Sequence, residues 1–364
     1  MQAARPPQGN APARGQGLRR IVLLLLAALL AHPILAQTAS GPWMGFFPSP
    51  ARIEWSSLLA TLRGIGRHAD AVLLQRNVPW EAFEQGPEAA SRRFADLDNL
   101  VRLSRAQGLE PIFVVDALNG LDRRAFQGVP AAWGKPSFAD PRIRRAFRNF
   151  AVRIARSYRP RYLGLGSEVN TYMTAHPEDA PHLVSLYLET YAAVKRASPA
   201  TRVFATFQWD ELRAAPGGPD WSLIEAFEPR LDLWVISSYP CLWLGGRPPG
   251  AGYYAPLTRR TTRPLAVGEG GCASRGTPRH PGSDRNQTAY LDAIADQLGP
   301  RLEFWIYLLY NDLDLDAYRE AVGSGRDLQT LELFARMGLA DEKGRPKPAL
   351  ETWDRIRRRL RSLP

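Results

Sequence analysis

The sequence predicts a single (β/α)₈ barrel. A short apolar run followed by an amphipathic helical stretch recurs eight times between residues 42 and 362. The runs are continuously apolar, as in parallel strands that are buried on both faces. No long linker or low-complexity stretch interrupts this region. Because a barrel of this type holds about 250 residues or more in one domain, the length does not require a second domain.

The expected strands are bounded by polar, Gly or Pro residues. In chain order they are Trp43–Phe47, Ala71–Gln75, Pro111–Asp116, Tyr162–Glu168, Arg202–Phe207, Leu233–Tyr239, Leu265–Glu269 and Phe304–Tyr310. Helices are expected where apolar residues recur at spacings of three and four. They are Ile53–Arg67, Ser91–Gln107, Arg142–Tyr158, Leu183–Ala197, Ser222–Phe227, Gln287–Leu298 and Leu328–Met337. The sixth strand is followed by a Gly/Pro-rich segment, 245–252, instead of a clear helix.

Residues 1–36 have the pattern of a secretory signal peptide. Arg19 and Arg20 precede the apolar run Ile21–Ala31, and Ala36 offers a small residue for cleavage. At eleven residues the run is too short to span a bilayer comfortably. We therefore expect cleavage after Ala36, no stable membrane insertion of the 37–364 domain, and a secreted or periplasmic location. An uncleaved anchor is the alternative, and the arginine pair also permits twin-arginine export.

Composition excludes several classes of function. The chain has 364 residues, 45% of them hydrophobic and 23% charged, which is typical of a globular protein. Its net charge of +11 is concentrated near the two ends and shows no basic motif interleaved with aromatic residues, so no nucleic-acid partner is expected. The five histidines form no HxH or HExxH pair, and two cysteines are too few for a Cys-rich zinc module. We expect neither a metal nor a cofactor.

The ends of the expected strands carry polar and aromatic residues. In a (β/α)₈ barrel the functional site lies at the carboxyl ends of the strands. There the sequence places Arg76, Asp116, Glu168, Asn170, Trp209, Tyr239 and Glu269. Carboxylates and amides hydrogen-bond sugar hydroxyls, and indole rings stack on pyranose rings. The expected partner is therefore a poly- or oligosaccharide.

Glu168 and Glu269 are the expected catalytic pair. A period of two places Gly164, Gly166 and Glu168 on one face of the fourth strand. The same period places Val267 and Glu269 on one face of the seventh strand. Glycosidic hydrolysis needs one acid to protonate the leaving oxygen and one carboxylate to meet the developing oxocarbenium ion. Two glutamates at the ends of these strands fit those roles better than two structural ion pairs.

Three short motifs resemble a known group of enzymes: Gly166–Asn170 (GSEVN), Ser238–Pro240 (SYP) and Val267–Glu269 (VGE). The chain resembles the clan of retaining glycoside hydrolases with (β/α)₈ barrels. Its sixth strand is similar to that of the endo-β-1,4-galactanase family. The resemblance implies that Glu168 is the acid/base and Glu269 the nucleophile.

The same resemblance assigns further residues. It implies that Tyr239 is the phenol beside the nucleophile, that Arg76 is the arginine near it, and that Trp305 stacks on the sugar. The clan usually has Asn before the acid/base glutamate, where this chain has Ser167, and Asn170 is the expected replacement. This departure leaves a non-catalytic carbohydrate-binding protein on the same barrel as the alternative. A structural protein of the cell envelope is less consistent with two glutamates.

Tryptophans are frequent at or near the expected rim. They are Trp43, Trp80, Trp133, Trp209, Trp243 and Trp305. Each could pack in the core, but six together favour a carbohydrate-binding cleft.

Cys241 and Cys272, the only cysteines, are expected to form a disulfide. Each follows a strand that carries an expected site residue, and adjacent strands lie about 4.8 Å apart. The export signal would deliver them to an oxidising compartment. Two separate buried thiols are the alternative.

Overall fold

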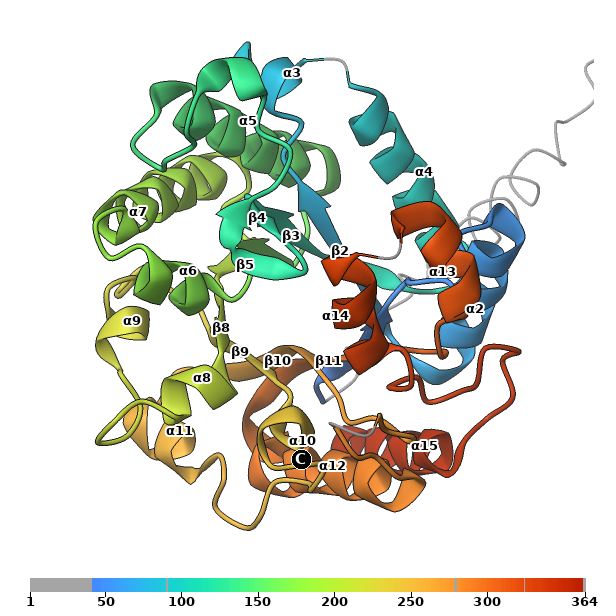
Figure 1. The fold of residues 1–364 in the computed structure, drawn as a ribbon. Helices are drawn as coiled ribbons and strands as arrows, with labels where there is room; N and C mark the ends of the chain where they lie inside the picture. Colours follow the sequence, from blue (N-terminus) through green and yellow to red (C-terminus); the bar gives the residue numbers. More distant parts are fainter. Residues whose placement is uncertain (1–40, 90, 278–279, 324, 363–364) are drawn as a thin grey trace, which may run out of the picture. The chain divides into compact units, whose positions relative to one another are not determined.

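The computed structural model describes residues 41–89, 91–277, 280–323 and 325–362, which form a (β/α)₈ barrel (Figure 1). The barrel strands are β1 (Trp43–Phe47), β2 (Ala71–Asn77), β3 (Glu110–Asp116), β6 (Tyr162–Leu165), β7 (Arg202–Phe204), β8 (Thr206–Gln208), β9 (Trp234–Ser238), β10 (Leu265–Gly270) and β11 (Leu302–Leu309). All their pairings are parallel. The fold class predicted from the sequence is confirmed.

The fifth barrel position is shared by two short strands. β7 and β8 are separated by Ala205; β7 pairs with β6, and β8 pairs with β9. The sheet order β7-β6-β3-β2-β1-β11-β10-β9-β8 therefore closes on itself at this position. All eight predicted strands are present, although the fourth ends at Leu165 rather than at Glu168.

The barrel interior is filled by small and branched side chains together with a few aromatic rings. These residues are Ala71, Leu73, Ile112, Val114, Tyr162, Phe204, Leu233, Val235, Ala266, Phe304 and Ile306. Alternate residues of the same strands face outward and pack against the helices. The interior is therefore a packed core, and space for a ligand is left only beyond the strand ends.

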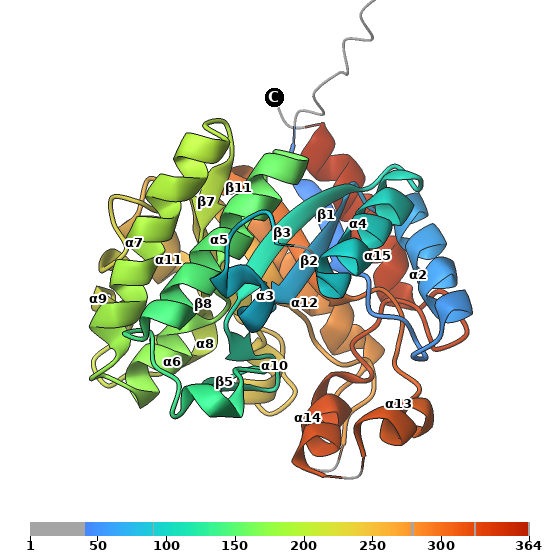
Figure 2. The ribbon, with the colours of Figure 1, turned by 90° about the horizontal axis from the view of Figure 1, so that it is seen from above.

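Helices follow the strands. The longer ones are α2 (Trp55–His68), α4 (Arg92–Arg105), α5 (Pro141–Tyr158), α7 (Ala180–Ala197), α12 (Asp284–Gln297) and α15 (Pro348–Arg361). Shorter ones are α3 (Trp80–Glu84), α6 (Val169–Ala175), α8 (Trp209–Arg213), α9 (Ser222–Glu225), α10 (Pro240–Trp243), α11 (Ala255–Arg260), α13 (Leu315–Val322), α14 (Arg326–Phe334), and the 3₁₀ turns Ala131–Trp133 and Gly299–Arg301. In Figure 2, α6, α8, α10, α13 and α14 lie at the same end of the barrel.

The eighth outer helix is α15, so the prediction of that helix at Leu328–Met337 is wrong. Part of that segment forms α14, which belongs to the mouth of the barrel. α15 packs beside α12, and its Trp353 contacts the rings of Phe46 and Trp305. The many arginines of α15 make its amphipathic pattern hard to see in the sequence. Its apolar face, at helical spacing, consists of the buried residues Leu350, Trp353, Ile356 and Leu360.

Within the described part of the chain, no helix combines the length and the apolar character needed to cross a membrane. The predicted signal peptide, residues 1–36, lies outside the described residues.

Candidate functional site

A β-hairpin inserted after β3 brings an arginine into the mouth of the barrel. The hairpin consists of β4 (Leu118–Asn119) and β5 (Asp122–Phe126), joined through Gly120 and Leu121. Side chains alternate along β5, so Arg123 is buried at 8% exposure while Arg124 faces solvent. The hairpin therefore aims one cation at the strand ends.

The Arg123 guanidinium bridges three carboxylates. Its Nε donates to Glu168 Oε2 at 3.0 Å, and its Nη1 donates to Asp116 Oδ2 at 2.5 Å. Nη2 donates to Ser167 Oγ at 3.3 Å and lies 3.9 Å from Glu269 Oε2. Glu168 and Glu269, the two glutamates predicted to be catalytic, lie far apart in the sequence and come together around one guanidinium.

Glu168 reaches the mouth through a turn and not by continuation of a strand. β6 ends at Leu165, Gly166 has φ +120°, and Glu168 has φ +49°. A Cβ at Gly166 would also lie 2.7 Å from Val169 Cγ1, so glycine suits this turn. The Glu168 backbone N–H donates to Thr206 Oγ1 at 2.8 Å, and Ser237 Oγ donates to Glu168 Oε1 at 2.5 Å.

Glu269 points to the mouth because β10 contains a bulge. Val267 pairs with Ile236, but Glu269 pairs with the next residue, Ser237, so Gly268 is the extra residue. Val267 packs outward against the helices, and the bulge returns Glu269 to the inner side. The prediction that Val267 and Glu269 share a face is therefore wrong, although it placed Glu269 at the mouth.

The phenol of Tyr239 donates a hydrogen bond to Glu269 Oε1. Its own position is fixed by Asp210, whose Oδ2 accepts the Tyr239 backbone N–H at 2.6 Å. The other oxygen of Asp210 accepts from the Tyr253 hydroxyl at 2.5 Å. Burial raises the pKa of Asp210 to about 6. The hydrogen bonds to its carboxylate stabilise the charged form and oppose this rise.

The acids at the mouth are electrostatically coupled. Burial, followed by repulsion from Glu168, raises the pKa of Glu269 to about 7, while Arg123 and the Tyr239 hydrogen bond oppose the rise. Burial also raises the pKa of Asp116, and Arg123 opposes this shift. Arg123 is therefore the charge that allows several carboxylates to occupy one buried site.

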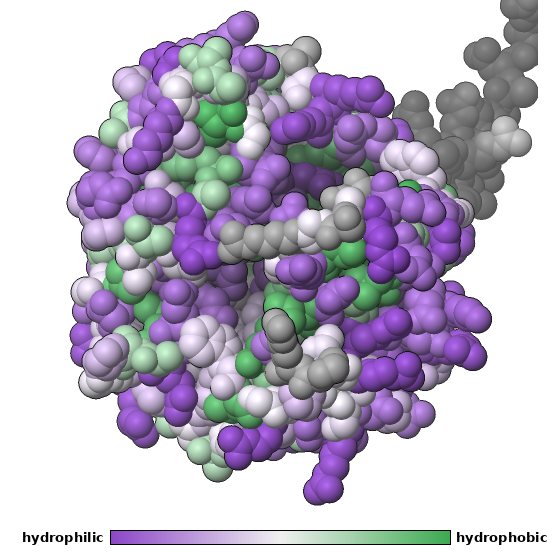
Figure 3. Space-filling view, viewed as in Figure 1, coloured by the Kyte–Doolittle hydropathy of each residue, from purple (hydrophilic) through white to green (hydrophobic). Residues whose placement is uncertain are grey.

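A cavity of about 310 Å³ opens onto the two glutamates. It is lined by Ser49, Gly120, Leu121, Glu168, Gln208, Tyr239, Leu242, Trp243, Glu269, Leu308, Leu309, Leu313, Tyr318, Leu331 and Phe334. Trp243 is 52% exposed and offers its ring at the rim. Figure 3 shows hydrophobic surface on the α13–α14 side of this end. The cavity combines two carboxylates with apolar and aromatic walls, as small-molecule sites do.

Asn170 does not line this cavity. Its Oδ1 accepts the backbone N–H of Gln208 at 2.7 Å, and its Nδ2 donates to the Gln208 carbonyl at 3.3 Å. Asn170 therefore ties α6 to the end of β8. The position before the acid, Ser167, instead contacts Arg123 and Thr206.

Trp209 and Trp305 are fully buried away from the cavity. Trp209 lies against Trp221 and Tyr254. Trp305 is on the outer face of β11 and contacts Trp353, whereas the cavity is lined by Leu308 and Leu309 at the end of the same strand. Among the aromatic residues that line the cavity in the described part of the chain, Trp243 is the most exposed, and Tyr318 and Phe334 are partly exposed.

Arg76 is not brought to Glu269. It lies near the end of β2 and lines two other cavities, one between α2 and α4 and one beside Arg93 and Asp96. Its side chain faces outward, since the inward positions on β2 alternate with it at Leu73 and Gln75. The place expected for Arg76 is occupied by Arg123. The only sequence signal for Arg123 was the Asn119-Gly120 turn, which is typical of a hairpin.

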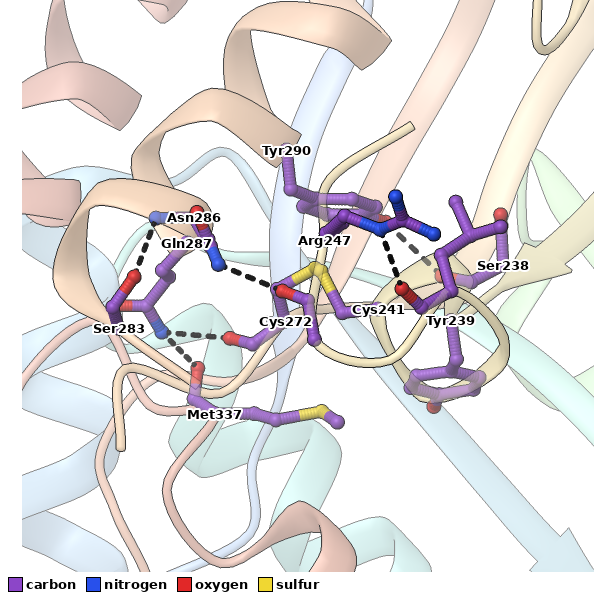
Figure 4. The surroundings of a disulfide bond; sticks show 12 residues. Ser238, Tyr239, Cys241, Arg247, Cys272, Ser283, Asn286, Gln287, Tyr290 and Met337 are labelled. Atoms are coloured by element: carbon purple, nitrogen blue, oxygen red, sulfur yellow. Dashed lines mark hydrogen bonds between the residues drawn. A yellow bond between two sulfur atoms is a disulfide. The ribbon is translucent and has the colours of Figure 1, made fainter. Parts of the chain in front are cut away.

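Cys241 and Cys272 form a disulfide, with a Cα–Cα distance of 5.5 Å and a separation of 31 residues (Figure 4). The bond joins α10, two residues after Tyr239, to the segment after Glu269. Gln287 Nε2 donates to the Cys272 carbonyl at 3.1 Å and fixes this segment to α12. The bond predicted from the sequence is present next to the site.

Among the described residues, no group of three or more His, Cys, Asp or Glu side chains could hold a metal ion. Arg123 occupies the centre of the acidic cluster at the mouth.

No family model matches the sequence, and no curated protein matches it. Among solved structures, the exo-β-1,4-mannosidase Op5Man5 from Opitutaceae bacterium strain TAV5 has a TM-score of 0.65 at 17% identity, covering 88% of this chain and 59% of that one. This chain therefore spans less than two thirds of Op5Man5. A GH5_18 protein from Streptomyces cattleya has a TM-score of 0.62 at 18% identity, covering 90% and 82%. A family 39 glycoside hydrolase from Bacteroides cellulosilyticus WH2 has a TM-score of 0.56 at 16% identity, covering 89% and 65%. At these identities the similarity shows that the chain shares their (β/α)₈ fold.

Proposed function

We propose that the protein is a retaining glycoside hydrolase that cleaves a β-linked poly- or oligosaccharide, with Glu168 as acid/base and Glu269 as nucleophile. The observation that carries this proposal is the meeting of both carboxylates at the Arg123 guanidinium, in the wall of a cavity of about 310 Å³. In retaining enzymes the carboxyl groups lie about 5–5.5 Å apart, and in inverting enzymes about 6.5–9.5 Å apart. Two carboxylates within reach of one guanidinium favour the shorter spacing.

The reaction would proceed by double displacement. Glu269, oriented by the Tyr239 hydroxyl, attacks the anomeric carbon while Glu168 gives its proton to the glycosidic oxygen. The glycosyl–Glu269 ester forms and the leaving group departs as an alcohol. Glu168 then takes a proton from water, which attacks the same carbon and releases Glu269 as a carboxylate. Two inversions give net retention of the anomeric configuration.

Arg123 and Ser237 hold Glu168 in place for both steps. Arg123 Nε binds one oxygen and Ser237 Oγ binds the other. Asp116 in turn anchors Arg123, and Gln75 Nε2 donates to Asp116 Oδ2 at 2.7 Å. This hydrogen-bonded chain gives the site a fixed geometry before substrate binds, which is a main source of enzymatic rate enhancement.

β-Mannosides are the first substrates to test. Op5Man5 is described as an exo-β-1,4-mannosidase, and GH5_18 proteins have been solved in complex with Manβ1-4GlcNAc. The similarity to endo-β-1,4-galactanases, predicted from the sixth strand, makes β-1,4-galactosides the second class. We also propose that the protein acts outside the cytoplasm, which the signal-peptide pattern and the Cys241–Cys272 disulfide support.

Carbohydrate binding without turnover is the second candidate function. Two observations favour it: both oxygens of Glu168 accept hydrogen bonds from protein donors, and Ser167 stands where the clan has Asn. The group that usually reaches the sugar 2-hydroxyl is therefore absent from that position.

Release of reducing ends from β-1,4-linked mannan, galactan and glucan separates the two candidates. The wild-type protein is expected to release reducing ends from at least one polymer, and Glu269→Gln to release none. Arg124→Gln, an exposed neighbour of Arg123, is the matched control and is expected to act like the wild type. Binding of a polymer by calorimetry with no release by the wild type would instead support the binding protein.

A further inference from the structure

A second cavity adjoins the catalytic one on the rim of the barrel. It measures about 450 Å³ and is lined by residues of the β1–α2 segment, of β2 and of α4. Ser49 lines both this cavity and the catalytic one. Gln75 lies in its wall and donates to Asp116, which binds Arg123. A ligand that extends past Ser49 would therefore leave the catalytic centre and enter this cavity.

Arg76 links this cavity to a third one. The third cavity, of about 320 Å³, is lined by Arg76, Asn77, Arg93, Asp96, Gln127, Gly128 and Phe150. Among the described residues, no hydrogen-bond acceptor binds the Arg76 guanidinium and no carboxylate lies within 4 Å of it. Burial lowers the pKa of Arg76, and Asp96 acts on it only through its more distant charge.

The Arg76 side chain is partly buried, and its guanidinium faces the two cavities without a protein partner among the described residues. A cation in such a place has lost part of its hydration and gains from a hydrogen-bonded anion. Most of the buried charges in this protein are paired, as Arg123 is with three carboxylates. Arg93, which is exposed on α4, adds a second positive charge to the same cavity. Arg76 and Arg93 thus present two guanidinium groups to the same cavity, opposed by the one carboxylate of Asp96.

The residues beside Arg76 suit a sugar ring. Trp55 is 68% exposed and Ile53 is 54% exposed, and both line the 450 Å³ cavity. An exposed indole offers a flat apolar face with a polar edge, which matches the face of a pyranose. Gln75 and Glu54 add hydrogen-bonding groups.

We propose that these two cavities bind an acidic sugar residue of the substrate, with its anionic oxygen atoms held by Arg76 and Arg93 and its ring against Trp55. The shared chemistry is an oxyanion, either the carboxylate of a uronic acid or a sulfate ester, which a guanidinium binds through two parallel hydrogen bonds. The substrate is then an acidic β-linked glycan, and the net charge of +7 on residues 37–364 favours its approach. This inference rests on the proposed function for the identity of the ligand.

Calorimetry on the Glu269→Gln protein tests the proposal without requiring turnover. Three oligosaccharides of the same β-1,4-linked backbone serve as probes: unsubstituted, substituted with glucuronic acid, and substituted with sulfate. At least one acidic probe is expected to bind about tenfold more tightly than the unsubstituted one, as for hydrogen bonds to a charged group. Preference for the uronate, the sulfate or both identifies the source of the oxyanion.

Four further substitutions, each made in the Glu269→Gln protein, assign the effect to the site. Arg76→Met is expected to abolish the preference, Arg93→Gln to reduce it severalfold, and Asp96→Asn to increase it by removing the competing charge. Arg92→Gln, on the same helix but outside the cavity, is the matched control and should leave the preference unchanged.

Equal binding of all three probes, or an undiminished preference in Arg76→Met, would overturn the proposal. Arg93→Gln and Asp96→Asn alter exposed side chains and keep the test valid if Arg76→Met does not fold. The two proposals fail separately. Hydrolysis of neutral glycans with no preference for acidic ones refutes only this inference. An Arg76-dependent preference in a protein that hydrolyses no β-glycan refutes only the proposed function.

Discussion

Arg123 Nε lies 3.0 Å from Glu168 Oε2, and this contact connects a hairpin after the third barrel strand to the acid after the fourth. The same guanidinium binds Asp116 and lies near Glu269. The Arg123 side chain is only 8% exposed, so solvent screens its charge weakly. Its positive charge offsets the mutual repulsion of the three carboxylates around it. The geometry of the proposed catalytic pair therefore depends on a residue outside both catalytic strands.

Arg123→Met is expected to lower the free energy of unfolding and to abolish turnover. Removing one partner of a buried ion pair leaves uncompensated charge and costs about 3–5 kcal/mol. Denaturant unfolding at pH 7 measures the loss of stability, with Arg124→Gln as the control. At pH 5 the defect should be smaller, because Glu269, with a pKa of about 7, is then protonated. A variant as stable and as active as the wild type would contradict the role given to Arg123.

The pH dependence of kcat/KM should show an acid limb near pH 7. Glu269 must be a carboxylate to act as nucleophile, and its pKa is raised to about 7 by burial and by Glu168. The Tyr239 hydroxyl stabilises this carboxylate, so Tyr239→Phe is expected to move the limb to higher pH. Tyr253→Phe, which removes a hydrogen bond to Asp210 instead, is the comparison. A limb at an unchanged pH in Tyr239→Phe would show that the phenol does not act on the nucleophile.

Glu269→Gln is expected to stabilise the protein more at pH 8 than at pH 4.5. The folded protein binds a proton at Glu269 up to about pH 7, whereas the unfolded chain loses it near pH 4.5. The free energy of unfolding of the wild type therefore falls as pH rises between these values, by about 3 kcal/mol from this group. The neutral glutamine removes that dependence. Unfolding curves of both proteins between pH 4.5 and pH 8 test this prediction. A stability advantage of Glu269→Gln over the wild type that shrinks with rising pH would contradict it.

The Cys241–Cys272 disulfide should stabilise the exported protein. It closes a loop of 31 residues, for which chain entropy gives roughly 3–4 kcal/mol. The Cys241→Ala/Cys272→Ala double variant is expected to lose stability of this order and to lower kcat, because the bond joins the segments that follow Tyr239 and Glu269. Mass spectrometry of the unreduced protein checks the bond directly, and two alkylatable thiols would show that it does not form.

The sequence predicts the barrel well because its strands are continuously apolar and regularly spaced. The same property hides which way each strand faces. β11 is apolar on both faces, so alternation could not decide that Trp305 packs outward against Trp353 and that Leu308 lines the cavity. The arginines of α15 similarly concealed the outer helix that carries Trp353.

The site was predictable only in part. The positions of Glu168 and Glu269 after two strands indicated the mouth, yet both reach it through irregular backbone, a left-handed residue at Glu168 and a bulge at Gly268. Neither feature follows from a period of two. Arg123 was missed because its partners lie up to 146 residues away in the chain, and only the fold brings them together. Arg76, chosen by analogy, lies on the outward face of β2.

The central claim is that Glu168 and Glu269 act as acid/base and nucleophile, and azide rescue of Glu168→Ala tests it most directly. With a 2,4-dinitrophenyl β-glycoside the leaving group needs no proton, so the glycosyl–Glu269 ester still forms in the variant. The ester then accumulates, because the general base that would activate water for its hydrolysis has been removed. Added azide, which needs no base, should restore turnover and give the β-glycosyl azide, identified by proton NMR. An α-glycosyl azide, or no rescue in a variant whose wild-type parent hydrolyses the same glycoside, would contradict the assignment.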